Sequence, residues 1–296
     1  MKKTVQRDMT KGSPTRIILG FTLPLFLGNV FQQFYNMADT IIVGQFVGTG
    51  ALAAVGSTGT IMFLITGFAT GLGTGFTILT AQRFGAGDMK GMRRSVFTAA
   101  VLTVIVSVLV TAVSVIFMHP LLDLMQTPAD IYDDAYDYII VIMWGLAAQM
   151  LYNLLSALLR AIGNSKMPLY FLILAAALNV VLDLVFIINF QMGTAGAAYA
   201  TVISQGISGL LCLLYIVKAV PIFRLSRRDM VMDGKMMAEQ LKVGLPMALP
   251  FSITAIGSIM LQSAVNGLGS TYVAAVAAGS KMYQLLACPF VAMGAT

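Results

Sequence analysis

Two carboxylates lie deep inside apolar segments of this sequence, and they are the residues best able to do chemistry there. Asp39 lies in the apolar segment from Thr15 to Phe46, and Asp183 lies in the one from Pro168 to Phe190. Placing a carboxylate near the middle of a bilayer costs about 2.5–3.5 kcal/mol on insertion scales. Because an amide would join neighbouring helices at lower cost, we expect these carboxylates to bind a cation or a proton.

Polar side chains follow the carboxylates at helical spacing. They recur every three or four residues, so each set lies on one helical face. Carboxylate, amide and hydroxyl oxygens suit a hard cation such as Na⁺, and a buried carboxylate can carry a proton instead. Interhelical hydrogen bonds, at about 1 kcal/mol each, are the alternative role for the amides and hydroxyls. The stripes are Asn29, Gln32, Gln33, Asn36 and Asp39; Gln149, Asn153 and Ser156; Asn179 and Asp183; and Thr201, Ser204, Gln205 and Ser208.

The composition is that of an integral membrane protein. Hydrophobic residues make up 58% of the 296 residues and charged residues only 10%, whereas a soluble domain has about 25% charged residues. With about 20 apolar residues needed to cross a bilayer, the sequence predicts an all-α protein with seven complete spans and the start of an eighth. The predicted spans are Thr15–Phe46, Ala53–Phe84, Met92–Met118, Tyr136–Ile162, Pro168–Phe190, Ala195–Ala219 and Ala238–Asn266, and the eighth begins near Val273.

The charges alternate between successive loops. Every basic residue except Lys281 lies on one side of the predicted spans, and an acidic loop from Asp123 to Asp137 lies on the other. The positive-inside rule therefore predicts a cytoplasmic N-terminus. The net charge of +6 reflects this topology, so we expect no nucleic-acid partner. The first apolar run is about twice the length of a signal-peptide core and is expected to be retained.

Part of the sequence is repeated after a polar connection from Pro221 to Lys235. An even number of spans separates the copies, which predicts parallel repeats related by an axis along the membrane normal. We therefore expect a six-helix N-terminal lobe (1–219), a cytoplasmic linker (220–236) and the beginning of an incomplete C-terminal lobe (237–296). The matching pairs are Leu23-Pro24-Leu25 with Leu245-Pro246-Met247, and Gly48-Thr49 with Gly269-Ser270.

Nothing in the sequence favours an enzyme. The single histidine, His119, lies at the end of a span, which leaves no Ser–His pair or metal triad inside the bilayer. The string from Gly85 to Asp88 matches a membrane aspartyl-protease motif, but it falls in a basic loop and predicts a turn. Three glycines at four-residue spacing, Gly67, Gly71 and Gly75, predict close helix packing or a flexible segment. We expect no cofactor.

With these residues identified, the whole chain resembles the multidrug and toxic compound extrusion (MATE) family of cation-coupled efflux transporters. The resemblance implies twelve spans in two six-helix lobes around a central cavity that opens alternately to either side. This chain would then be a fragment that carries the first lobe and the start of the second. The stretches that carry the resemblance are FQQFYNMADTIIVGQFVGTGALAAVG, QRFGAGD, LRAIGNSKMP, LNVVLDLVF, GTAGAAYATVISQ and GLPMALP.

The resemblance also implies roles for individual residues, and it is closest to the bacterial and archaeal branch related to the DNA-damage-inducible type. The family's first-lobe cation site, for Na⁺ or H⁺, maps onto Asp39, Asn179, Asp183 and Thr201. A bending proline of the family maps onto Pro24, and an aromatic residue of the cation site maps onto Tyr35. We expect Gln32, Asn36, Asn153 and Gln205, together with Pro24 and Tyr35, to face the substrate cavity or to serve in gating.

These inferences predict a monomeric antiporter of the bacterial inner membrane, surrounded by lipid. It would expel amphipathic organic cations in exchange for Na⁺ or H⁺. A lipid-linked oligosaccharide flippase is the first alternative, but it would need basic residues in its cavity, and the residues expected there are acidic. A non-transporting membrane scaffold is the second alternative, and it gives no reason for two carboxylates in the bilayer.

Overall fold

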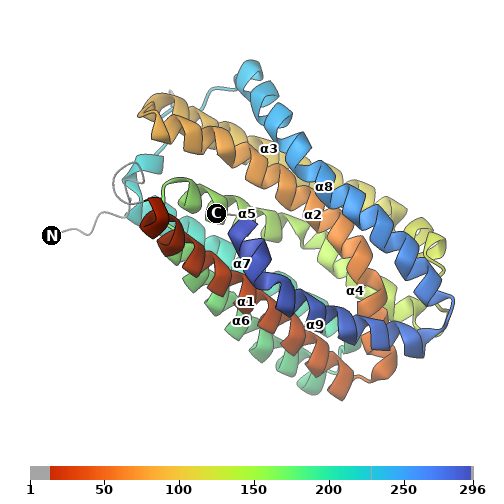
Figure 1. Ribbon diagram of the computed structural model, residues 1–296. Coiled ribbons are helices and arrows are strands. Elements are labelled where there is room, and N and C mark those ends of the chain that lie inside the picture. The colour runs from red at the N-terminus through yellow and green to blue at the C-terminus, as the bar shows by residue number, and fades with distance from the viewer. Residues whose placement is uncertain (1–13, 228, 295–296) are drawn as a thin grey trace.

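The structure, a computed structural model, describes residues 14–227 and 229–294, without the side chains of residues 14–19, 21, 281, 285 and 288–294. Every described element of secondary structure is a helix, which confirms the all-α prediction (Figure 1). The helices are α1 (Pro14–Phe46), α2 (Thr49–Gly85), α3 (Met89–Leu124), α4 (Tyr132–Trp144), α5 (Leu146–Ala161), α6 (Lys166–Leu184), the π-helix η1 (Val185–Asn189), α7 (Gly193–Ala219), the 3₁₀-helix η2 (Pro221–Phe223), α8 (Gly234–Asn266) and α9 (Ser270–Gly294).

Several of these helices can cross a membrane. Within the described residues, α2, α3, α6 with η1, α7 and α8 are long and apolar enough, and the bent pair α4–α5 makes a sixth span if counted as one. Helices α1 and α9 occupy the first and eighth predicted spans, although they are not among these five or six. The molecule is thus a multi-pass membrane protein.

The fourth predicted span, Tyr136–Ile162, is bent where the sequence suggested one span. Its two helices, α4 and α5, meet at an angle of 49° around Gly145. A Cβ atom at Gly145 would overlap the side chain of Val202 on α7. The absence of a side chain therefore lets the bend pack directly on the neighbouring helix.

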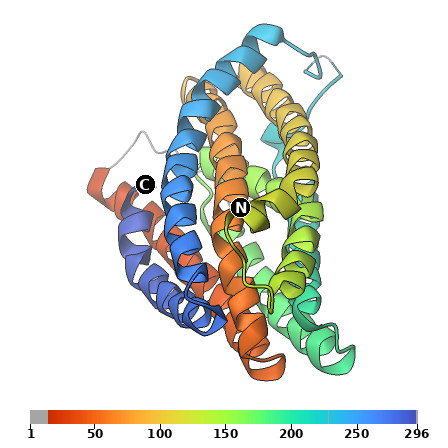
Figure 2. The same ribbon diagram turned by 90° about the vertical axis from the view of Figure 1, so that its right-hand side faces the viewer.

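The sequence repeat is visible in how the helices pair. Both hairpins, α1–α2 and α8–α9, turn through a glycine with positive φ, which is +126° at Gly48 and +100° at Gly269. A residue other than glycine would be strained there. Helix α1 packs along α9, and α2 packs along α8, so each hairpin lies against the other (Figures 1 and 2).

The interface between α2 and α8 is built on the predicted glycine stripe. A Cβ atom at Gly71 would lie 2.7 Å from the Cα of Ala248, and one at Gly75 would overlap the Cα of Gly244. At Gly67 the added atom would lie 3.2 Å from the side chain of Phe251. The two helices therefore touch backbone to backbone, which confirms the prediction of close packing.

One buried amide ties the same interface to α3. The Nε2 of Gln240 on α8 donates to the carbonyl oxygens of Phe76 at 3.2 Å and Ser95 at 2.9 Å, and it lies 3.0 Å from the Ser95 hydroxyl. That hydroxyl also pairs with Thr80 at 2.8 Å. Gln240 has no exposed surface. Buried amide bonds of this kind fix the register of α8 against α2 and α3.

The turn between α2 and α3 forms as the sequence predicts. Asp88 caps α3, with its carboxylate accepting from the backbone N–H of Gly91 at 2.8 Å, and Gly87 has a φ of +74°. A capping side chain of this type satisfies one of the free N–H groups at a helix start. The string from Gly85 to Asp88 is therefore a turn, as expected.

We predict that Gly75→Ala lowers the thermal stability of the protein in detergent, by about 1–3 kcal/mol, because the methyl group must push α8 away from α2. The matched control is Gly73→Ala on the same helix, where an added Cβ meets no atom within 4 Å. That variant should match the wild type or gain up to about 1 kcal/mol from helix propensity. Thermal unfolding curves of the two variants measure the difference. Equal unfolding midpoints for Gly75→Ala and Gly73→Ala would contradict the packing argument.

Candidate functional site

The two predicted carboxylates meet between α1 and α6. Asp39 is 7% exposed, and both Asn179 and Asp183 have no exposed surface. Helix α1 packs on α6, and α6 packs on α7, so the polar faces of three helices converge. The carboxylates are close enough for each to raise the electrostatic energy of the other. Sequence spacing placed these residues on helical faces, and the fold brings the faces together.

A hydrogen-bonded group completes the site. The hydroxyl of Tyr35 on α1 donates to Thr201 Oγ1 on α7 at 3.0 Å. The Nδ2 of Asn179 donates to the same oxygen at 3.4 Å. A hydroxyl oxygen has two acceptor positions, so both are engaged here. Thr201 therefore orients Tyr35 and Asn179 in this structure, and it could bind a cation only after one of those bonds breaks.

Unlike Thr201 Oγ1, the side-chain oxygens of Asn179 and Asp183 on α6 accept no hydrogen bond from the described residues. Among the described residues, neither carboxylate oxygen of Asp183 has a hydrogen-bond partner, and the same holds for Asn179 Oδ1. Buried polar atoms are normally paired, and exceptions cluster at sites where a proton or an ion binds. Asn179 and Asp183 therefore offer three acceptor atoms one helical turn apart. Their chemistry fits a proton or a hard monovalent cation.

The electrostatics of the site favour binding positive charge. Two carboxylates that share a buried space cannot both stay ionised without compensation. Within the described residues, no cluster of three or more His, Cys, Asp and Glu side chains is arranged to hold a metal. The donor set is two carboxylates, an amide and hydroxyls, which is consistent with Na⁺ or H⁺.

The backbone is irregular next to Asp183. Helix α6 ends at Leu184 and continues directly into the π-helix η1, in which the N–H of Phe190 donates to the carbonyl of Val185 at 3.1 Å. Short π-helical turns inside helices occur often at functional sites. The wider turn sets the direction in which the chain leaves the carboxylate.

Sequence reasoning did not single out one buried residue near this site. Tyr138 on α4 is 4% exposed and belongs to the same buried cluster as Ile42 of α1 and Ile187 of η1. An aromatic residue in an apolar segment breaks no hydrophobic pattern. Only the packing of α4 onto the other helices reveals it.

The other predicted site residues are spread more widely. Pro24 is buried and lies inside a continuous α1, and Gln32 and Asn36 are half-buried on the same helix. Gln205 is 8% exposed, and its Oε1 has no hydrogen-bond partner among the described residues. The side chain of Lys281 lies outside the described residues.

Asn153 belongs to a different contact. Its Nδ2 donates to Thr70 Oγ1 on α2 at 3.1 Å, which is an interhelical hydrogen bond. Ser208 makes a similar bond to the carbonyl of Phe171 at 3.2 Å. For these two residues the structure shows the interhelical bonding that the sequence left open as the alternative.

The chain is similar to known proteins over nearly its full length. The family model MatE matches residues 24–185. The probable multidrug resistance protein YpnP of Bacillus subtilis is 32% identical over 289 residues, which are 97% of this chain and 64% of that protein. The FAD transporter of Shewanella oneidensis is 27% identical, over 92% of this chain and 61% of that protein.

The chain is also similar to solved transporter structures. A transporter of the MOP superfamily from Pyrococcus furiosus is 28% identical and superposes with a TM-score of 0.87, over 98% of this chain and 64% of that one. The chain thus spans a little under two thirds of the length of these relatives.

We predict that Asp183→Asn keeps or raises thermal stability. The nearly isosteric amide removes one of two buried carboxylates, and with it a desolvation penalty of up to several kcal/mol per ion. The matched control is Asp130→Asn, a change of the same type at an exposed position, which should leave the unfolding midpoint unchanged. Thermal unfolding in detergent measures both. A marked loss for Asp183→Asn would mean that the carboxylate serves the fold.

Proposed function

Because this chain belongs to the MatE family, we propose that it forms the first lobe and the start of the second lobe of a secondary active efflux transporter. The protein exports amphipathic organic cations in exchange for Na⁺ or H⁺. The observation that carries this proposal is the buried pair of Asp39 and Asp183, together with acceptor oxygens on Asn179 and Asp183 that find no hydrogen-bond partner among the described residues. The name of the relative YpnP, a probable multidrug resistance protein, supports it.

The site supports exchange through competition for one negative region. Asp39 and Asp183 attract either the coupling ion or a cationic substrate, and neutralising them weakens the hold on the other. Such competition moves substrate only if the ion binds the two conformations with different affinity. Thr201 is suited to sense that change, because an ion that recruits its oxygen must break the bond from Tyr35 or Asn179.

Domain boundaries and topology form part of the same proposal. The N-terminal lobe comprises residues 1–219, the linker residues 220–236 and the second lobe begins at 237. The pairing of α1 with α9 and of α2 with α8 supports two related lobes. The basic loops support a cytoplasmic N-terminus. We propose that the protein acts as a monomer in a bacterial inner membrane. By this orientation the acidic site lies in the outer half of the membrane, seven residues before α1 ends.

The substrate class rests on charge. A flippase for lipid-linked oligosaccharides would meet pyrophosphate and needs basic groups, whereas the buried groups where α1, α6 and α7 meet are acidic. The Shewanella oneidensis relative is named an FAD transporter. FAD therefore belongs in any substrate panel as the anionic competitor of an organic cation.

The decisive experiment is efflux from proteoliposomes that contain the full-length protein. We expect a fluorescent organic cation to leave under an imposed Na⁺ gradient or an imposed pH gradient. Asp39→Asn should reduce this flux at least tenfold, since it removes one of the two buried carboxylates. The control Asp130→Asn changes an exposed carboxylate in the acidic loop and should transport normally.

Three results would overturn parts of the proposal. Normal export by Asp39→Asn would remove the coupling role of the carboxylate pair. Export of FAD with no cation export would replace the substrate class. No flux of either substrate under either gradient, from protein that is shown to be folded, would remove the transport function proposed for this site.

A further inference from the structure

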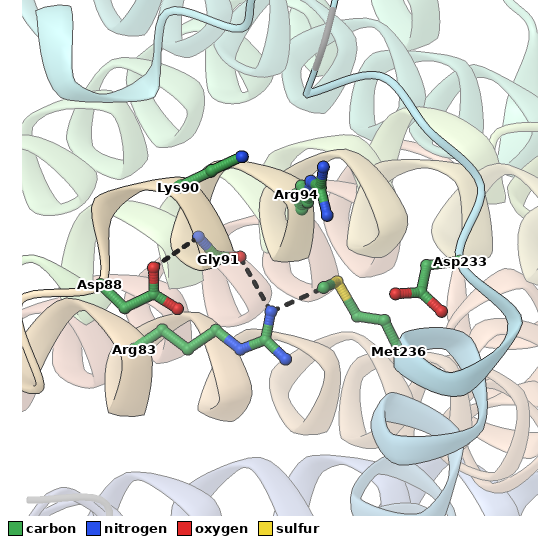
Figure 3. Close-up of a pocket in the computed structure, with 7 residues that line it drawn as sticks. All are labelled: Arg83, Asp88, Lys90, Gly91, Arg94, Asp233 and Met236. Carbon is green, nitrogen blue, oxygen red and sulfur yellow. Dashed lines mark hydrogen bonds between the residues drawn. The ribbon is translucent and has the colours of Figure 1, made fainter.

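A second charged site lies at the opposite end of the molecule from the carboxylate pair. A cavity of about 380 Å³ opens where the turn between α2 and α3 meets the start of α8 (Figure 3). Lys90 and Arg94 project from α3, while Asp233 and Met236 come from the beginning of α8. The remaining lining residues are Arg83, Asp88 and Gly91.

The lining of the cavity carries a small net positive charge. Three of its lining residues are basic and two are acidic. Both acids cap the helices that start here, since Asp88 accepts from the N–H of Gly91 at 2.8 Å and Asp233 accepts from the N–H of Lys235 at 3.0 Å. The cations that remain for a ligand are therefore those of α3.

Some of its donors have no protein acceptor. Among the described residues, the side chain of Lys90 takes part in no hydrogen bond or ion pair, and the buried Nε of Arg94 has no hydrogen-bond partner. Arg83 is engaged, donating to the carbonyl of Gly91 at 3.1 Å and lying 3.5 Å from Glu239 on α8. Lys90 and Arg94 are four residues apart, so their side chains leave the same face of α3.

The position of the cavity suits a lipid headgroup. Arg83 lies two residues before α2 ends, and Met236 is the third residue of α8, so the cavity lies at the end of two membrane-spanning helices. Headgroups lie at this level of a bilayer. The basic face of the protein is the one that meets the anionic leaflet of the membrane, where Lys and Arg clusters bind anionic lipids.

We propose that this cavity binds the phosphate group of an anionic phospholipid. Lys90 and Arg94 contact the phosphate from α3, at the edge of the cavity that faces the start of α8. The lipid thereby joins the cytoplasmic ends of α2, α3 and α8, next to the ion pair of Arg83 and Glu239. This role is independent of what the protein transports.

The test is native mass spectrometry of the full-length protein titrated with phosphatidylglycerol. Phosphatidylcholine and inorganic phosphate serve as separate arms. We expect the wild type to bind one phosphatidylglycerol and to prefer it to phosphatidylcholine. The double variant Lys90→Gln/Arg94→Gln should bind roughly 30-fold more weakly, as expected for two lost cations near a membrane surface.

The matched control is Lys218→Gln/Arg224→Gln, which removes two exposed basic residues of the same face but outside the cavity. It should bind phosphatidylglycerol like the wild type. Equal losses in both double variants would overturn the site in favour of diffuse charge attraction. Binding of inorganic phosphate with no binding of phosphatidylglycerol would overturn the lipid assignment.

The variant Lys90→Glu tests whether a loss of lipid binding could come from misfolding. Lys90 is exposed, so reversing its charge leaves the packing intact. The variant should keep the wild-type unfolding midpoint and still lose phosphatidylglycerol binding. Retained binding by folded Lys90→Glu protein would contradict the proposal.

Discussion

The main constraint on this structure is that two carboxylates are buried inside one membrane-spanning bundle. Asp39 and Asp183 come from helices far apart in sequence, and their repulsion must be compensated. The neighbouring residues do not stabilise the Asp183 carboxylate by hydrogen bonds, because its oxygens find no hydrogen-bond partner among the described residues. Burying such a pair lowers the stability of the fold, a cost that is common at functional sites.

The remaining helices hold this pair in place by packing with very small side chains. The glycine stripe on α2 brings the backbone of α8 into contact, and Gly145 lets the bent pair α4–α5 rest on α7. In a membrane the hydrophobic effect does not drive helices together, so close backbone contact and buried amide bonds such as those of Gln240 must do so. The positions of Asp39 and Asp183 relative to each other therefore depend on these helix contacts.

Most of the site could be predicted, because its signals are local in sequence. Asn179 and Asp183 are one helical turn apart, and a carboxylate in an apolar run is visible without a structure. The glycine stripe was visible for the same reason. Tyr138, the bend at Gly145 and the π-helix after Leu184 could not be predicted, since each depends on how a neighbouring helix packs. The saturation of Thr201 also needed geometry, because spacing shows which oxygens are near one another but not which donors already occupy them.

The same contacts limit how the molecule can change shape. Where α2 meets α8 through glycine, there are few side chains whose rotamers could absorb a small displacement, so the interface either stays closed or separates as a whole. Packed interfaces of this kind are bistable, and small shifts at a binding site are converted into rigid movements of whole elements. The acidic site between α1 and α6 and the basic cavity at the start of α8 lie towards opposite ends of the two paired hairpins. If the proposed ion and phosphate both bind, each favours the arrangement of the hairpins that it fits better, and the two would then act on the same equilibrium.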